Sequence, residues 1–227
     1  MRHPLCAAAL ALAPLLAQAY TLDFGQGPNA PTLCATNADG SGSASVCANG
    51  SWVNQSYGDM AGLVDVSYGQ PLTPNTSLRW WDQRYNNLYG VLWADGGDGP
   101  QSYARIDMRA LGGGLRLTNF TLGAYSETSR STQVDVFDLG SNALLYHYEG
   151  MVGDATTNTA TVFNVDLSSS TGLRLEWRNS AYNVGLDNVV LQAVPEPSSL
   201  ALMLGGLAGV LPLVRRRRQA SSARPAA

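Results

Sequence analysis

The side chains of this sequence best suited to bind a ligand are aromatic residues gathered between positions 80 and 103. Flat rings exposed on a protein surface can stack on the faces of sugars, while an Asp or Arg beside them hydrogen-bonds the hydroxyl groups. Neighbouring residues of a strand point to opposite faces of a sheet, so we expect one of two adjacent tryptophans in the core. Ordinary packing is the alternative for the whole cluster. The glycan-binding candidates are Trp80, Trp81, Tyr85 and Trp93.

Catalytic chemistry has little support in the residue types. Outside a predicted N-terminal leader the chain has one histidine, His147, and its surroundings favour a solvent-facing strand residue over the base of a catalytic triad. The sequence contains no Gly-x-Ser-x-Gly motif and no histidine spacing typical of zinc. A glycosidase needs two opposed carboxylates, and Asp is plentiful, but a sequence does not pair them. We therefore expect a protein that is not an enzyme, with a secreted hydrolase as a less favoured alternative.

Three cysteines become two if the leader is removed. Cys6 lies in the leader, whereas Cys34 and Cys47 lie in a stretch rich in Gly, Ser and Asn. An even pair in an exported chain predicts a disulfide, here closing a loop of about a dozen residues. A metal site would need more ligands than this pair supplies.

The first 19 residues predict a secretory signal peptide. A short positive start, Arg2 and His3, precedes an apolar stretch over 5–16 that only Pro14 interrupts. Ala17-Gln18-Ala19 then supplies the small-x-small pattern that a signal peptidase needs. We expect cleavage before Tyr20, with a buried N-terminal helix as the alternative.

The C-terminal segment predicts a single transmembrane helix. Pro195, Glu196 and Pro197 precede an uncharged apolar run over 200–214, and four arginines follow at once. Fifteen helical residues span about 22 Å, short of the ~30 Å hydrocarbon core, so hydropathy alone makes this a borderline span. Arginines hold their side of a helix in the cytoplasm, which predicts a cytoplasmic tail over 219–227. The arginines are Arg215, Arg216, Arg217 and Arg218.

The order of Pro-Glu-Pro, short apolar helix and Arg cluster resembles the PEP-CTERM sorting signal of exported bacterial proteins. The resemblance covers 194–218, about a tenth of the chain. It implies sorting by exosortase, a membrane protease-transpeptidase of Gram-negative bacteria that make extracellular polysaccharide, with processing near Pro195, Glu196 and Pro197. The same tail is also labelled an ice-binding protein C-terminal motif, which describes the tail and not the domain before it.

The part of the chain between the two ends is acidic. It carries 16 Asp and Glu residues against eight Arg and no Lys, which gives a net charge of −8. A domain this acidic repels phosphate backbones, so we expect no nucleic-acid partner.

The pattern of residues 20–193 predicts one β-sandwich domain. Apolar and charged residues alternate over 104–110 and 173–178, as expected for strands of a sheet that buries one face. About ten such segments, separated by turn signals and without a convincing amphipathic helix, favour an all-β fold. The candidate strands are 20–24, 62–68, 78–81, 88–93, 102–110, 115–125, 132–139, 143–149, 160–167, 172–178 and 184–192, with 28–58 irregular.

From about residue 102 to 192 the order of elements resembles the jelly-roll sandwich of PEP-CTERM proteins and carbohydrate-binding modules. The segment 185–191 is similar to the last strand of these domains. In many jelly-roll modules an acid near the first strand and one in the last strand share a structural calcium ion, which Asp23 and Asp187 would hold here. The alternative is that Asp187 hydrogen-bonds nearby backbone.

These observations predict an exported protein of the cell surface or extracellular matrix. We expect the helix to anchor it in the inner membrane until an exosortase-type protease processes it. Its expected role is a structural or adhesive component of a polysaccharide-rich envelope or biofilm. A carbohydrate-binding module is the alternative, with extracellular polysaccharide as the partner.

Overall fold

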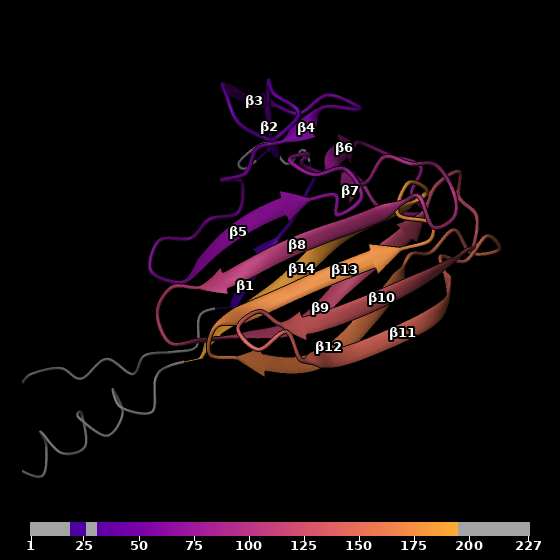
Figure 1. Cartoon of the computed structure of the whole chain (residues 1–227). Coiled ribbons are helices and arrows are strands. Elements are labelled where there is room, and N and C mark those ends of the chain that lie inside the picture. Colours follow the sequence, from indigo (N-terminus) through magenta and orange to yellow (C-terminus); the bar gives the residue numbers. More distant parts are fainter. Residues whose placement is uncertain (1–18, 26–30, 195–227) are drawn as a thin grey trace, which may run out of the picture.

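The computed structural model describes residues 19–25 and 31–194 of this chain, and in these residues the only regular elements are strands. They form two antiparallel sheets that pack face to face, which confirms the predicted all-β sandwich (Figure 1). The strands are β1 (Ala19–Leu22), β2 (Leu33–Ala35), β3 (Ala44–Val46), β4 (Trp52–Val53), β5 (Val64–Gly69), β6 (Arg79–Trp81), β7 (Val91–Trp93), β8 (Tyr103–Ala110), β9 (Gly114–Ala124), β10 (Arg130–Asp138), β11 (Leu144–Val152), β12 (Thr161–Ser169), β13 (Gly172–Arg178) and β14 (Val184–Val194).

The larger sheet runs in the order β12-β9-β14-β7-β6-β4-β2-β3, and β1 pairs with β14 beside this path. The smaller sheet runs β11-β10-β13-β8-β5. The pairs β9–β14 and β8–β13 join strands that are distant in sequence, so the fold depends on long-range pairing.

Alternation along the strands decides which side chains fill the space between the sheets. In β8, Ala104, Ile106 and Met108 are fully buried, whereas Arg105 and Asp107 lie on the outer face. The same period places apolar residues of β9, β13 and β14 against them. Large buried side chains of this core include Trp80, Trp177, Phe24, Phe120, Leu92 and Ile106.

The segment expected to be irregular contains the three short strands β2, β3 and β4. β2 pairs with both β3 and β4, and β4 pairs with β6, so this segment extends the larger sheet. Strands of two or three residues give too short an alternation to be found in a sequence. The disulfide between Cys34 and Cys47 fastens this extension, as predicted.

The predicted signal peptide, apart from Ala19 at the start of β1, and the predicted transmembrane helix and sorting residues lie outside the described residues. Within the described ranges no helix is long and apolar enough to cross a membrane. The strand β14 ends at Val194, directly before Pro195.

Candidate functional site

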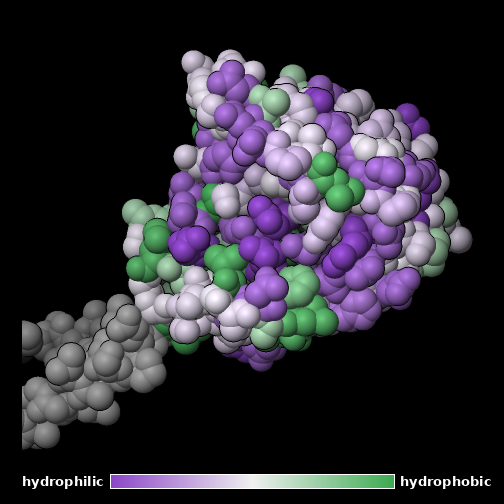
Figure 2. Space-filling model, viewed as in Figure 1, coloured by the Kyte–Doolittle hydropathy of each residue, from purple (hydrophilic) through white to green (hydrophobic). Residues whose placement is uncertain are grey.

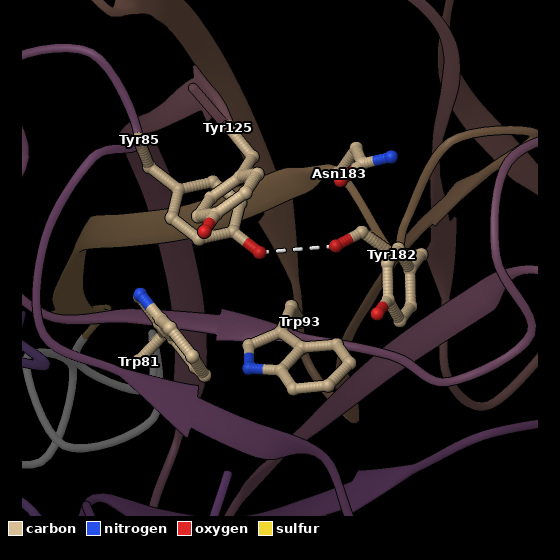
Figure 3. Close-up of a pocket in the computed structure, with 6 residues that line it drawn as sticks. All are labelled: Trp81, Tyr85, Trp93, Tyr125, Tyr182 and Asn183. Atoms are coloured by element: carbon tan, nitrogen blue, oxygen red, sulfur yellow. Dashed lines mark hydrogen bonds between the residues drawn. The ribbon is translucent and has the colours of Figure 1, made fainter. Parts of the chain in front are cut away.

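A small aromatic pocket lies at one end of the sandwich (Figure 3). Its volume is about 90 Å³. Every lining residue lies at a strand end or in a connection: Trp81 ends β6, Trp93 ends β7 and Tyr125 follows β9. The remaining lining residues, in the 82–90 connection and just before β14, are Tyr85, Tyr182 and Asn183.

The pairing of β6 with β7 explains which tryptophans reach the pocket. Trp81 and Trp93 each end their strand, and the register Arg79↔Trp93 and Trp81↔Val91 places both on one face of the larger sheet. Trp80 points to the other face, where it is 2% exposed and its Nε1 donates to the Phe24 carbonyl oxygen at 2.7 Å. The structure therefore removes Trp80 from the glycan-binding candidates, because alternation along β6 commits its ring to the core.

The rings hold one another by edge-to-face contacts. Trp81 lies 6.4 Å from Trp93 and 6.1 Å from Tyr125, with interplanar angles of 77° and 90°. Trp93 in turn meets Tyr182 at 5.1 Å and 88°, and Tyr85 meets Tyr125 at 5.1 Å and 54°. Such pairs are stabilising beyond their buried area, so the pocket walls are preorganised.

The polar groups of the pocket differ in how they are satisfied. The Tyr85 hydroxyl donates to the Tyr182 carbonyl oxygen at 3.0 Å (dashed in Figure 3), and burial raises the pKa of Tyr85, so it stays neutral. The Asn183 amide donates to Asp98 at 2.7 Å. The indole Nε1 of Trp93, on the side of its ring that faces Trp81, has no hydrogen-bond partner among the described residues. Trp93 is only 8% exposed, so this is a buried donor without an acceptor.

Two arginines already lie over rings of the pocket. The Arg84 guanidinium lies 5.4 Å from the ring of Tyr125, and that of Arg79 lies 5.8 Å from the ring of Trp93. Arg79 is also paired with Asp95 at 2.8 Å. Because these cations lie at the ring faces that would attract a ligand cation, the pocket favours a neutral ligand over a positively charged one.

The outer face of the smaller sheet brings together carboxylates that the sequence could not pair. Asp135 on β10 lies opposite Glu176 on β13, and Arg178 contacts both. His147 is exposed on β11, and its Nδ1 lies 2.6 Å from Asp135. Tyr103 donates to Glu176 as well, so neighbouring side chains hold both carboxylates in one polar network.

The candidate calcium residues lie near each other at the junction of β1 and β14. Asp187 Oδ1 accepts a hydrogen bond from the backbone nitrogen of Phe24 at 3.0 Å, and its Oδ2 accepts one from Asn188 at 2.9 Å. Asp23 accepts one from the backbone nitrogen of Gly25 at 2.7 Å. Burial, and to a smaller extent the charge of Asp23, raises the pKa of Asp187 to about 7.

The bond from the Phe24 backbone nitrogen is of the kind that the alternative interpretation of Asp187 expects, whereas Asn188 donates through its side-chain amide. No cluster of three or more His, Cys, Asp or Glu side chains suited to a metal occurs in the part of the chain that the structure describes. Calcium binding at Asp23 and Asp187 stays a prediction.

Sequence reasoning missed half of the pocket. Tyr125, Tyr182 and Asn183 line it, yet they lie about 20 to 80 residues beyond the aromatic cluster at 80–103. The available signal was their position: Tyr125 ends the predicted strand 115–125, and Tyr182 and Asn183 directly precede the predicted strand 184–192. Aromatic residues at strand ends meet only when the pairing of those strands is known.

Fold and site together define an all-β sandwich with an aromatic pocket at one end. The C-terminal segment matches the family model described as the PEP-CTERM protein-sorting motif over residues 193–218. The chain therefore carries this sorting motif, which confirms the resemblance of its tail. The motif begins inside β14, since Ala193 and Val194 are still paired with β9.

Comparison with curated proteins found no match. Among solved structures, the chain is similar to a family 32 carbohydrate-binding module of AlyQ in complex with 4,5-unsaturated mannuronic acid, at 15% identity and a TM-score of 0.29, covering 44% of this chain and 74% of that one. The chain is also similar to a family 4 carbohydrate-binding module, at 12% identity and a TM-score of 0.30, and the match covers 63% of this chain and 86% of that one. A third similar structure is a family 11 carbohydrate-binding module from Clostridium thermocellum in complex with a beta-1,3-1,4-mixed-linked tetrasaccharide. Its identity is 8% and its TM-score 0.28, and the match covers 66% of this chain and 99% of that one. No functional conclusion follows from similarity at this level.

Proposed function

We propose that this protein is exported, sorted by an exosortase-type membrane protease, and displayed at the cell surface or in the extracellular matrix. There it serves as an adhesive component of a polysaccharide-rich envelope or biofilm. It adheres by binding a saccharide in the aromatic pocket and acts by binding, not by catalysis.

The sorting motif supports the first part of this proposal. The match over 193–218 contains Pro195, Glu196 and Pro197, the apolar run 200–214 and the four arginines. A predicted signal peptide at the other end of the chain supplies the route across the inner membrane.

The observation that carries the second part is the unpartnered Nε1 of Trp93 in a pocket walled by rings. A buried donor without an acceptor destabilises the unliganded protein, and an oxygen of a ligand would relieve that cost. A sugar offers both a hydroxyl oxygen for this donor and a C–H face for the rings. The six lining side chains include no carboxylate, imidazole or thiol, which favours binding over catalysis.

A glycan array probed with the exported protein in detergent tests this function. We expect selective binding to a small set of saccharides, and its loss in the Trp81→Ala variant. Tyr89→Ala is the matched control, because Tyr89 is the most exposed aromatic side chain at 76% and does not line the pocket. Equal binding by both variants would show that the saccharide binds outside the pocket, and no selective binding by the parent would leave a structural role without a saccharide ligand.

A further inference from the structure

The strand β14 connects the aromatic pocket to the sorting motif. It begins at Val184, next to the pocket residue Asn183, and ends at Val194, where the motif has begun. Eleven residues of strand span about 36 Å. The pocket and the point where the chain leaves the sandwich are therefore at opposite ends of the domain (Figure 1).

Four connections form the surface at the Val194 end, and backbone hydrogen bonds join them. Leu111 donates to the carbonyl oxygen of Leu63 at 3.0 Å, and Leu139 donates to that of Gly172 at 2.9 Å. The register Val194↔Gly114 places the end of β14 among them. This surface, here called the tail end, consists of the turn 61–63, which closes the connection 54–63 before β5, and of the connections 111–113, 139–143 and 170–171.

None of the residues 61–63, 111–113, 139–143 and 170–171 is charged, and the exposed Asp59 lies further back in the connection before β5. These four segments contain Gly, Ser, Thr, Ala, Asn and Leu, and Leu111 and Leu144 at their margins are 52% and 55% exposed. Figure 2 shows hydrophobic surface at this end of the molecule, on the left. The carboxylate of Asp138, directly before 139–143, is held by Ser141 and Ser169.

The opposite end differs sharply in charge. Its connections hold several acids and few arginines, so that end repels an anionic surface. The acids are Asp82, Asp95, Asp98, Glu127 and Asp154.

We propose that the tail end is a membrane-contact surface, which rests on the lipid bilayer with Leu111 and Leu144 in the headgroup region. The membrane-contact proposal depends on the proposed anchoring of the chain by the apolar run 200–214. The aromatic pocket then faces away from the membrane.

The length of chain beyond Val194 favours the bilayer as the occupant. Only five residues separate Val194 from Leu200, the start of the apolar run, and at full extension this distance is at most about 20 Å. The tail end must therefore lie close to the headgroups. Bringing uncharged loops there avoids the cost of desolvating charges, and exposed leucines gain from leaving water.

Depth measurements on labelled full-length protein test this surface. A fluorophore sensitive to polarity is attached at Leu111→Cys or Leu144→Cys, with Thr157→Cys at the acidic end as the matched control. All variants carry Cys6→Ser, and the disulfide protects Cys34 and Cys47 from the label. The protein is reconstituted into vesicles of phosphatidylethanolamine and phosphatidylglycerol that contain a nitroxide-headgroup lipid. Thermal melting of each variant verifies that it is folded.

We expect labels at Leu111 and Leu144 to be quenched several-fold more than the label at Thr157. A further variant, Leu207→Cys, reports insertion of the tail itself. A quenched Leu207 label together with equal exposure of the Leu111 and Thr157 labels would overturn the membrane contact alone. An unquenched Leu207 label would overturn the anchoring and this inference with it. Saccharide binding would be unaffected by that result, because the glycan array tests it separately. If the label at Leu111→Cys is protected from water only when the processing protease is present, the protease and not the bilayer is the partner of the tail end.

Discussion

At the scale of single residues, the indole nitrogen of Trp93 is the group that most directly implies a ligand. Its donor is buried and unpartnered, whereas the neighbouring Trp80 has an acceptor in the Phe24 carbonyl oxygen. Trp93→Phe keeps an aromatic ring in the wall and removes the donor together with part of the indole ring system. Because a net hydrogen bond is worth about 1 kcal/mol, saccharide affinity should fall roughly fivefold. Titration calorimetry checks this, and an unchanged Kd would show that the ligand does not use Nε1.

Asp187 predicts a dependence of stability on pH. Its pKa is about 7 in the folded protein, well above the ordinary value of 3.8, because burial penalises the charged form. Between about pH 4 and 7 the folded state holds a proton that the unfolded state has lost, so the free energy of unfolding falls as pH rises. Its full contribution is present below pH 4 and lost above pH 7, and amounts to at most roughly 4 kcal/mol.

Asp187→Asn keeps an acceptor for the Phe24 backbone nitrogen and removes this titration. The variant should melt higher than the parent at pH 8 in chelator, and the difference should shrink toward pH 4. Calorimetry across this range checks the prediction. A difference that does not change with pH would show that the Asp187 carboxylate is not the titrating group.

Calcium adds a separate expectation at the same residue. A cation at Asp23 and Asp187 would favour the charged carboxylate, so millimolar Ca²⁺ should raise the melting temperature of the parent at pH 8. It should not do so for Asp187→Asn. An unchanged melting curve of the parent, against chelator, would leave Asp187 as a backbone hydrogen-bonding residue only.

At the scale of elements, long strands could be predicted from the sequence and short ones could not. The sequences of β8 and β13, eight and seven residues long, show the alternation that a half-buried sheet requires. The strands β2, β3 and β4 have two or three residues each and gain their order from pairing and from the disulfide. Half of the pocket was missed for a related reason, since Tyr125 and Tyr182 reach Trp81 and Trp93 only through the pairing of β9, β14 and β7.

The Cys34–Cys47 disulfide should stabilise its own segment and not the whole sandwich. It closes a loop of 13 residues and joins β2 to the end of β3, far from β10 and β11. Loop entropy limits its contribution to about 3 kcal/mol. In Cys34→Ala/Cys47→Ala, hydrogen exchange should accelerate in β2, β3 and β4, with little change in the smaller sheet. Uniform acceleration in both sheets would show that the extension is part of the cooperative core.

At the scale of the whole molecule, the two sheets bring the ends of the described chain together. β1 pairs with β14, so Ala19 lies opposite Gln192, two residues before the strand ends. If the signal peptide is removed before Tyr20, the new N-terminus lies beside the start of the sorting motif, at the tail end. Export and sorting signals then act on the same end of the sandwich and leave the aromatic pocket clear.

The tail gives the last prediction. Val194 is held in β14 opposite Gly114, and Pro195 and Pro197 cannot donate backbone hydrogen bonds and disfavour helix in the residue before each. The motif near Pro195 to Pro197 is therefore expected to stay extended and open to a membrane protease, with Glu196 as a charged mark. Replacing Pro195, Glu196 and Pro197 by Ala should leave the protein anchored but uncut, as shown by the C-terminal peptide in mass spectrometry.

Neutral residues in place of Arg215, Arg216, Arg217 and Arg218 should instead disturb the anchoring. Each guanidinium costs about 2.5 to 3.5 kcal/mol at the centre of a bilayer, so four of them fix the orientation of the segment 200–214, and removing them releases that constraint. Fractionation of cells that contain an exosortase separates the two variants: the arginine variant should lose correct membrane orientation, and the Pro-Glu-Pro variant should accumulate in the membrane at full length. If the parent protein isolated from the surface of such cells still ends at Ala227, the tail is a weak anchor that no protease processes.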